Sequence, residues 1–149
     1  MFIRKSVKGE GRMSATRGLE GVVATQSSVS SIIDDVLTYQ GYNIDDLTDH
    51  ATFEEVVYLL WNNRLPNKNE LEELSEQLTD NMDVPKEIFD YMKSYPNKDV
   101  HPMSAVRTAV SQLGLYDNSV EDMSEEANYE KALRLQAKIA TIVTGFARI

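Results

Sequence analysis

The sequence HPMSAVRTAVSQLG, residues 101–114, has the start, the periodicity and the end of one sharply bounded helix. His101 can act as the N-cap, Pro102 suits the first helical position, and Gly114 can end the helix after about three turns. Apolar side chains recur at spacings of three and four residues and therefore share one stripe: Met103, Val106, Val110 and Leu113. Ala105 and Ala109 keep the flank beside this stripe thin, so we expect another helix to pack closely there.

The sequence KIATIVTGFARI, residues 138–149, predicts that second helix. It forms the latter half of a helix expected from Tyr129 to Ile149, with Ser124 as a plausible start signal. Apolar residues cover most of its circumference, and such a helix needs contacts on several sides. Because no C-cap signal follows, we expect the fold to continue beyond these residues.

The residues before position 101 complete a mainly α fold with short β-strands near the start. Between residues 17 and 44, β-branched residues, serines and glycines favour short paired strands, with turns at Asp34-Asp35 and at Gly41. Everything after Ile44 has helical periodicity. The clearest start signals are two capping boxes and a proline: Thr52 with Glu55, Asn67 with Glu70, and Pro85.

Composition limits the classes of partner. The 149 residues suit one domain, and their formal net charge of -9 disfavours nucleic acid. The absence of cysteine excludes a disulfide framework and a thiol nucleophile, and it is compatible with the cytoplasm. The longest strongly apolar run, residues 139–149, is far shorter than the roughly 20 residues of a membrane span, so we expect no membrane anchor.

A search for catalytic motifs finds none. With only His50 and His101 as imidazole donors and no cysteine, a metal site is not expected, and His101 is interpreted as a helix cap. Glycine-rich phosphate loops and the GxSxG motif are absent. Two arginines remain of interest. Arg17 stands beside Gly18, where it could reach an anionic ligand, whereas Arg107 lies off the apolar stripe and is expected to form an ion pair.

Four segments, in order along the chain, resemble citrate synthases of the bacterial type: RGLEGVVATQSSVSSIIDD, LTYQGYNIDDL, FEEVVYLLWNNRLPNKNELEEL and HPMSAVRTAVSQLG. The resemblance runs from about Arg17 to Ile149, and 2-methylcitrate synthases are similar over the same segments. It implies an acyltransferase of the tricarboxylic acid cycle that condenses acetyl-CoA with oxaloacetate and binds no permanent cofactor. The family's catalytic residues lie in motifs resembling GPLHGGA and GHRVY and at a later aspartate, all missing here. We therefore expect no catalytic residue in this chain and no activity from it alone.

The same resemblance assigns the parts of the chain. Residues 16–149 would be the incomplete N-terminal portion of the family's large domain, after a disordered leader of residues 1–15. Independently, the residues before Met13 favour the hypothesis that translation starts at Met13. Arg17 would correspond to the arginine that binds the CoA phosphates. The helices over residues 101–114 and 129–149 would pack against their copies in a homodimer. An alternative is a non-catalytic helical protein that binds another subunit through the same apolar faces.

Overall fold

The computed structural model describes Val23 and residues 26–33, 35–95 and 99–149. Within these ranges the protein has a mainly α fold, as predicted, and the expected leader of residues 1–15 lies outside them. One antiparallel sheet contains β1 (Ser30–Ile33), β2 (Val36–Tyr39) and β3 (Tyr42–Asn43). The helices are α1 (Ile44–His50), α2 (Phe53–Asn62), α3 (Lys68–Asp80), α4 (Lys86–Lys93), α5 (Pro102–Leu113) and α6 (Glu125–Phe146).

The sheet is a small meander whose two turns fall at the predicted breaks. Asp35, in the turn between β1 and β2, has a φ of 64°. Gln40 and Gly41 connect β2 to β3 with φ values of 49° and 85°, the left-handed pair that a two-residue hairpin turn requires. The Gln40 side-chain amide donates a hydrogen bond of 2.6 Å to Oδ1 of Asn63, which joins this turn to the end of α2.

The predicted helix starts are confirmed by hydrogen bonds. Thr52 and Asn67 both form complete capping boxes, in which each cap's backbone N–H donates to a glutamate carboxylate three residues later. His101 caps α5, because its Nδ1 accepts a hydrogen bond of 3.2 Å from the backbone N–H of Met103. Pro85 directly precedes α4, where a missing N–H costs the helix nothing.

The buried face of α5 differs from the predicted stripe. Val106 and Leu113 are buried as expected, and so are Ala105 and Ala109 on the flank where close packing was predicted, but Met103 of the stripe is 65% exposed. The reason is that α5 approaches its neighbours with its thin alanine side, which turns Met103 out of the contact. Gly114 ends the helix with a φ of −60°, so its left-handed freedom is not used there.

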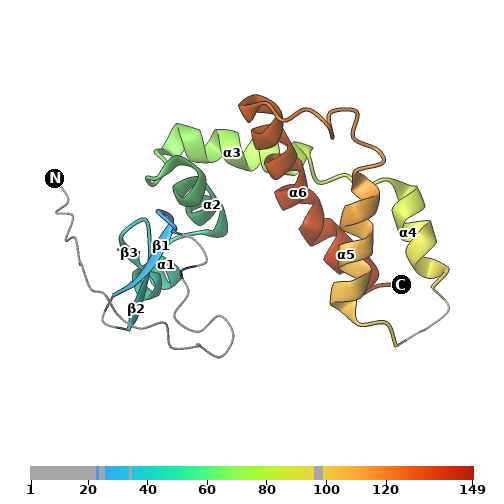
Figure 1. Cartoon of the computed structure of the whole chain (residues 1–149), viewed down its shortest axis with the longest axis horizontal. Coiled ribbons are helices and arrows are strands. Elements are labelled where there is room, and N and C mark those ends of the chain that lie inside the picture. The colour runs from blue at the N-terminus through green and yellow to red at the C-terminus, as the bar shows by residue number, and fades with distance from the viewer. Residues whose placement is uncertain (1–22, 24–25, 34, 96–98) are drawn as a thin grey trace, which may run out of the picture.

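The last helix is shifted relative to the prediction of residues 129–149. Its start at Glu125 lies four residues before Tyr129 and confirms the start signal at Ser124, whose hydroxyl accepts a hydrogen bond from the backbone N–H of Ala127. It ends at Phe146, where Arg148 N–H donates to the carbonyl of Gly145 in a tighter final turn. The 22-residue helix is long enough to run past α3 at one end and α5 at the other (Figure 1).

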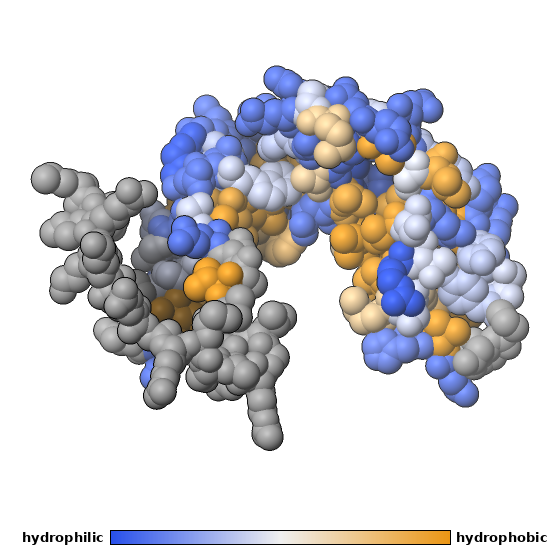
Figure 2. All heavy atoms as spheres, viewed as in Figure 1, coloured by the Kyte–Doolittle hydropathy of each residue, from blue (hydrophilic) through white to orange (hydrophobic). Residues whose placement is uncertain are grey.

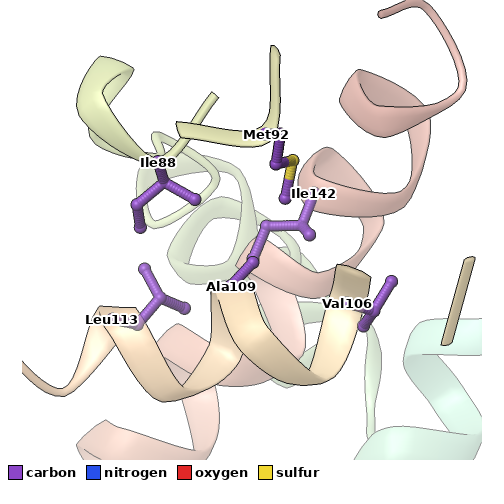
Figure 3. Packing of buried hydrophobic residues seen from close by; sticks show 6 residues of the cluster. All are labelled: Ile88, Met92, Val106, Ala109, Leu113 and Ile142. Carbon is purple, nitrogen blue, oxygen red and sulfur yellow. The ribbon is translucent and has the colours of Figure 1, made fainter. Parts of the chain in front are cut away.

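Two apolar cores lie along this helix, and the elements together form an arch (Figure 1). One core joins α6 to α2 and α3 and contains Val57, Leu74, Leu78, Leu133 and Ala137. The other joins α6 to α4 and α5 and contains Ile88, Met92, Val106, Ala109, Leu113 and Ile142 (Figure 3). An edge-to-face contact between Trp61 and Tyr129, with ring centroids 5.5 Å apart, adds a further link between α2 and α6.

We expect Ile142→Ala to lower the free energy of unfolding by about 2–5 kcal/mol, because it leaves a cavity in place of most of a fully buried side chain. Ile142 has 0% exposure, whereas Ile139 on the same helix is 39% exposed and serves as the matched control. Ile139→Ala should cost less than about 1 kcal/mol. Urea unfolding of both variants measures the difference, and equal losses would contradict the core assigned here.

Candidate functional site

An open cleft of about 850 Å³ lies beside the loop that connects α5 to α6. Its walls come from three parts of the chain: residues 83–85 before α4, the end of α5 with its following loop (residues 110, 113, 114 and 116–120), and the α6 side chains of Lys131, Arg134, Leu135 and Lys138. The lining therefore combines apolar side chains with three cations and two carboxylates. It is the place where distant segments of the described chain bring ionisable groups together.

Arg134 is the centre of a hydrogen-bonded network in this cleft. Its guanidinium donates to Asp117 Oδ2 at 2.8 Å and to the Ser119 hydroxyl at 3.0 Å, and it also reaches the Glu130 carboxylate at 3.3 Å. The Ser119 hydroxyl and backbone N–H both donate to Asp117 Oδ1. Chiefly through the Ser119 hydroxyl, and then through Arg134, these bonds lower the pKa of Asp117 to about 2. The network fixes the connecting loop onto α6.

The two lysines of the cleft bind backbone carbonyls. Lys131 Nζ donates to the carbonyls of Val120 and Asp122 in the connecting loop. Lys138 Nζ donates to the carbonyl of Asn81, at 3.0 Å, and to that of Asp83, which anchors the segment before α4. Burial lowers the pKa of Lys138. All three cations of the cleft thus already have acceptors supplied by the chain itself.

A second polar cluster connects α2 to α3. The Arg64 guanidinium forms a two-pronged contact with Glu70, at 2.6 and 2.8 Å, and also donates to the Tyr58 hydroxyl at 3.0 Å. The hydrogen bond from Arg64, followed by that from the Asn67 backbone, lowers the pKa of Glu70 to about 2. Since every group is bonded within the cluster, it is a brace between two helices rather than a reactive site.

The structure places two of the three residues that the sequence singled out, and leaves the predicted CoA-phosphate contact at Arg17 untested. Arg17 lies outside the described residues, and His50 is an exposed residue in the last turn of α1. Arg107 was expected to form an ion pair, but its side chain is exposed and pairs with no carboxylate of the described chain. Sequence reasoning also missed the Arg134 network: the spacing of Glu130 and Arg134 hints at it, but Asp117 lies 17 residues away.

The described residues contain no group of three or more histidine, cysteine, aspartate or glutamate side chains placed to hold a metal ion. None of their helices has both the length and the apolar character needed to cross a membrane.

We expect Asp117→Asn to reduce stability at neutral pH and to flatten the loss of stability in acid. The folded pKa of about 2 lies below the ordinary value of 3.8, so this carboxylate stabilises the fold above about pH 4 and loses that effect as the pH falls towards 2. Urea unfolding across this range tests the variant against Asp80→Asn, which removes an exposed carboxylate from α3. Parallel pH profiles for wild type and Asp117→Asn would contradict the network.

Similar known proteins point to one family. A sequence model described as "Citrate synthase, C-terminal domain" matches residues 18–149. Citrate synthase 2 of Bacillus subtilis is 64% identical over 137 residues, covering 92% of this chain and 37% of that protein. The 2-methylcitrate synthase of Mycobacterium tuberculosis is 36% identical over 134 residues, covering 89% of this chain and 33% of that protein.

Comparison of the fold with solved structures points to the same family. The crystal structure of citrate synthase from Pyrobaculum aerophilum superposes with a TM-score of 0.77 at 31% identity, over 88% of this chain and 35% of that one. The chain thus spans little more than a third of the length of the relatives it matches. The extent of the family match, together with the shared fold, shows that this chain belongs to the citrate synthase family.

Proposed function

We propose that this chain is part of a citrate synthase, which condenses acetyl-CoA with oxaloacetate and water to give citrate and free CoA at the entry to the tricarboxylic acid cycle. The identity of 64% to citrate synthase 2 of Bacillus subtilis carries this proposal. The described residues form braces and cores but no arrangement of acid, base and nucleophile. The catalytic groups would therefore come from the part of the relatives that this chain does not span, and the chain alone would be inactive.

A 2-methylcitrate synthase, which uses propionyl-CoA instead, is the second candidate. Relatives with this name are 36% identical to the chain, so the same fold serves both substrates. The difference between 64% and 36% identity favours the citrate synthase. The distinction rests on overall similarity, because the described residues include no assigned acyl-CoA contact.

Arg17 is our candidate for a contact with the CoA phosphates, through its position in the RG-x-x-G sequence. A guanidinium suits this role because it donates parallel hydrogen bonds to phosphate oxygens.

We place the protein in the cytoplasm, where its lack of cysteine is compatible with reducing conditions. Its partners would be small-molecule substrates and a second subunit, without nucleic acid or a membrane.

The second subunit would pack against α5 and α6. Ile139 and Val143 on α6 lie four residues apart on one face, and both remain exposed beside the buried Ile142. Figure 2 shows apolar surface over α5 and α6, towards the inner side of the arch. The outer residues of α5 are more polar and include Arg107 and Ser111. We therefore assign the main apolar contact to α6. The same face could serve a non-catalytic subunit-binding protein, which an active chimera would exclude.

The direct test joins this chain to the part of Bacillus subtilis citrate synthase 2 that it does not match. We expect the chimera to release CoA from acetyl-CoA with oxaloacetate at a rate within about tenfold of the parent enzyme, because this chain and the segment that it replaces are 64% identical over 137 residues. The chain alone should release none. A parallel chimera with the Mycobacterium tuberculosis 2-methylcitrate synthase should be slower with either acyl-CoA. A folded first chimera without turnover would refute the proposed function.

We expect Val143→Asp to convert the chimera with Bacillus subtilis citrate synthase 2 from dimer to monomer, because the substitution places a charge within an apolar subunit contact. Val23→Asp introduces the same change at an exposed position outside the helices and should leave the dimer intact. Sedimentation velocity at several protein concentrations measures the outcome. A Val143→Asp chimera that stays dimeric would place the subunit contact elsewhere.

A further inference from the structure

Lys138 lies on α6 between the two apolar cores. Its neighbour Ala137 belongs to the core shared with α2 and α3, and Ile142, one turn later, belongs to the core shared with α4 and α5. The Lys138 side chain lines the cleft beside the α5–α6 loop, together with apolar residues such as Val84 and Leu135. Its amino group is therefore half-buried and yet open to a small molecule that enters the cleft.

The hydrogen bonds of Lys138 suit a neutral amine. Nζ donates to the carbonyl of Asn81, at 3.0 Å, and to that of Asp83, and it forms no ion pair with a carboxylate of the described chain. A protonated lysine has three N–H donors, and a neutral lysine has two. Loss of one proton therefore leaves both hydrogen bonds in place and frees a lone pair on Nζ.

The surroundings of Lys138 also favour the loss of that proton. Burial lowers the pKa of the Lys138 amine, the carboxylate of Asp83 opposes this effect, and the charge of Arg134 adds to it. The other charged groups of the cleft, Asp117 and Lys131, are bonded to the α5–α6 loop and to Arg134. A lysine with a depressed pKa holds more neutral amine near neutral pH, and the neutral amine is the nucleophile.

We propose that Lys138 is a modification site, at which the side-chain amine accepts an acyl group from an acyl-CoA thioester. The choice of donor rests on the proposed function, because acetyl-CoA is the substrate of that reaction. Nζ attacks the carbonyl carbon of the thioester, so that a C–N bond forms and the C–S bond breaks. CoA leaves as a thiolate, and the proton released by the amine passes to that thiolate or to solvent. Each amine accepts one acyl group, so the transfer needs no oxaloacetate and gives no turnover.

Acylation of Lys138 loosens the link between the two cores. An acylated Nζ has no charge and keeps one N–H, so it can no longer donate to the carbonyls of both Asn81 and Asp83. Asn81 is the C-cap of α3, and Asp83 lies in the segment that leads into α4. The modification therefore weakens the attachment of this connecting segment to α6.

The test is acylation of the intact chain by acetyl-CoA without oxaloacetate, with the acetyl occupancy of each lysine measured by peptide mass spectrometry. Exposure alone would favour Lys68, whose side chain is 87% exposed. We expect Lys138 to react at least about threefold faster than Lys68 at about pH 7.5. The advantage should shrink as the pH rises towards 10.5, the ordinary lysine pKa, because a solvated lysine then loses its proton as well.

A matched pair of substitutions tests the electrostatic control of the amine. Asp83→Asn removes the charge that holds the proton on Lys138 and keeps the backbone carbonyl, so it should raise the rate at Lys138 at least about twofold. Asp80→Asn removes an exposed carboxylate from the last turn of α3 and should leave the rate unchanged. Equal rates in the two variants would contradict the role of Asp83 and overturn the proposed activation.

A second pair tests the consequence of acylation. Lys138→Gln imitates the neutral amide, whereas Lys138→Arg keeps the charge and the donors. We expect the Tm of Lys138→Gln to lie roughly 2–4 °C below that of Lys138→Arg. Equal Tm values would contradict the loosened link.

Two results would overturn the modification site itself: reaction at Lys138 no faster than at Lys68, or the same relative rate in folded and urea-unfolded chain. The second comparison uses the wild-type chain, so it still decides if Asp83→Asn fails to fold. Acylation by acetyl phosphate but not by acetyl-CoA would also overturn the proposal. Acylation by both donors supports it, because the activation then lies in the amine.

The modification and the proposed function fail in different ways. An active chimera with Bacillus subtilis citrate synthase 2, combined with an unreactive Lys138, refutes the modification and leaves the function standing. A selectively acylated Lys138 combined with an inactive chimera supports the modification and refutes the function.

Discussion

The fold depends on one helix that contributes to two separate cores. Leu133 and Ala137 of α6 pack against α2 and α3, and Ile142 packs against α4 and α5. Neither core on its own buries many large side chains, so each relies on α6 to hold its helices in place. A break in α6 would separate the two ends of the arch in Figure 1. Continuous helical hydrogen bonding between these cores is therefore the main constraint on the structure.

Small residues set how closely the other helices approach α6. Ala109 on α5 and Ala137 on α6 are fully or almost fully buried, and each allows a neighbouring helix to come near. The same principle applies at Gly145, where an added Cβ would lie 2.3 Å from the ring of Phe89. Close packing on one side of α6 leaves Ile139 and Val143 on the other side, and this asymmetry gives the helix a free apolar face.

Polar networks have a different role, since they secure the connections rather than the cores. Arg134 fixes the α5–α6 loop, Lys138 fixes the segment before α4, and Arg64 joins α2 to α3. Each of these cations donates to groups of the chain itself. The described part of the chain thus has the character of a scaffold. This agrees with relatives that are about two and a half times as long as this chain.

The sequence by itself determined the helix starts, the turns and the family. Capping residues such as Thr52 and His101 act through bonds to residues two or three positions away, so local order along the chain specifies them. Only the tertiary structure decided which side of α5 is buried, and that Asp117 pairs with Arg134. Periodicity predicts an apolar stripe on the helix but not how the helix is rotated about its axis relative to its neighbours. That rotation is set in the fold, where the neighbouring helix packs on the side that permits the closest approach. The partner of a charged side chain depends likewise on how the loop folds back in space, which no spacing in the sequence records.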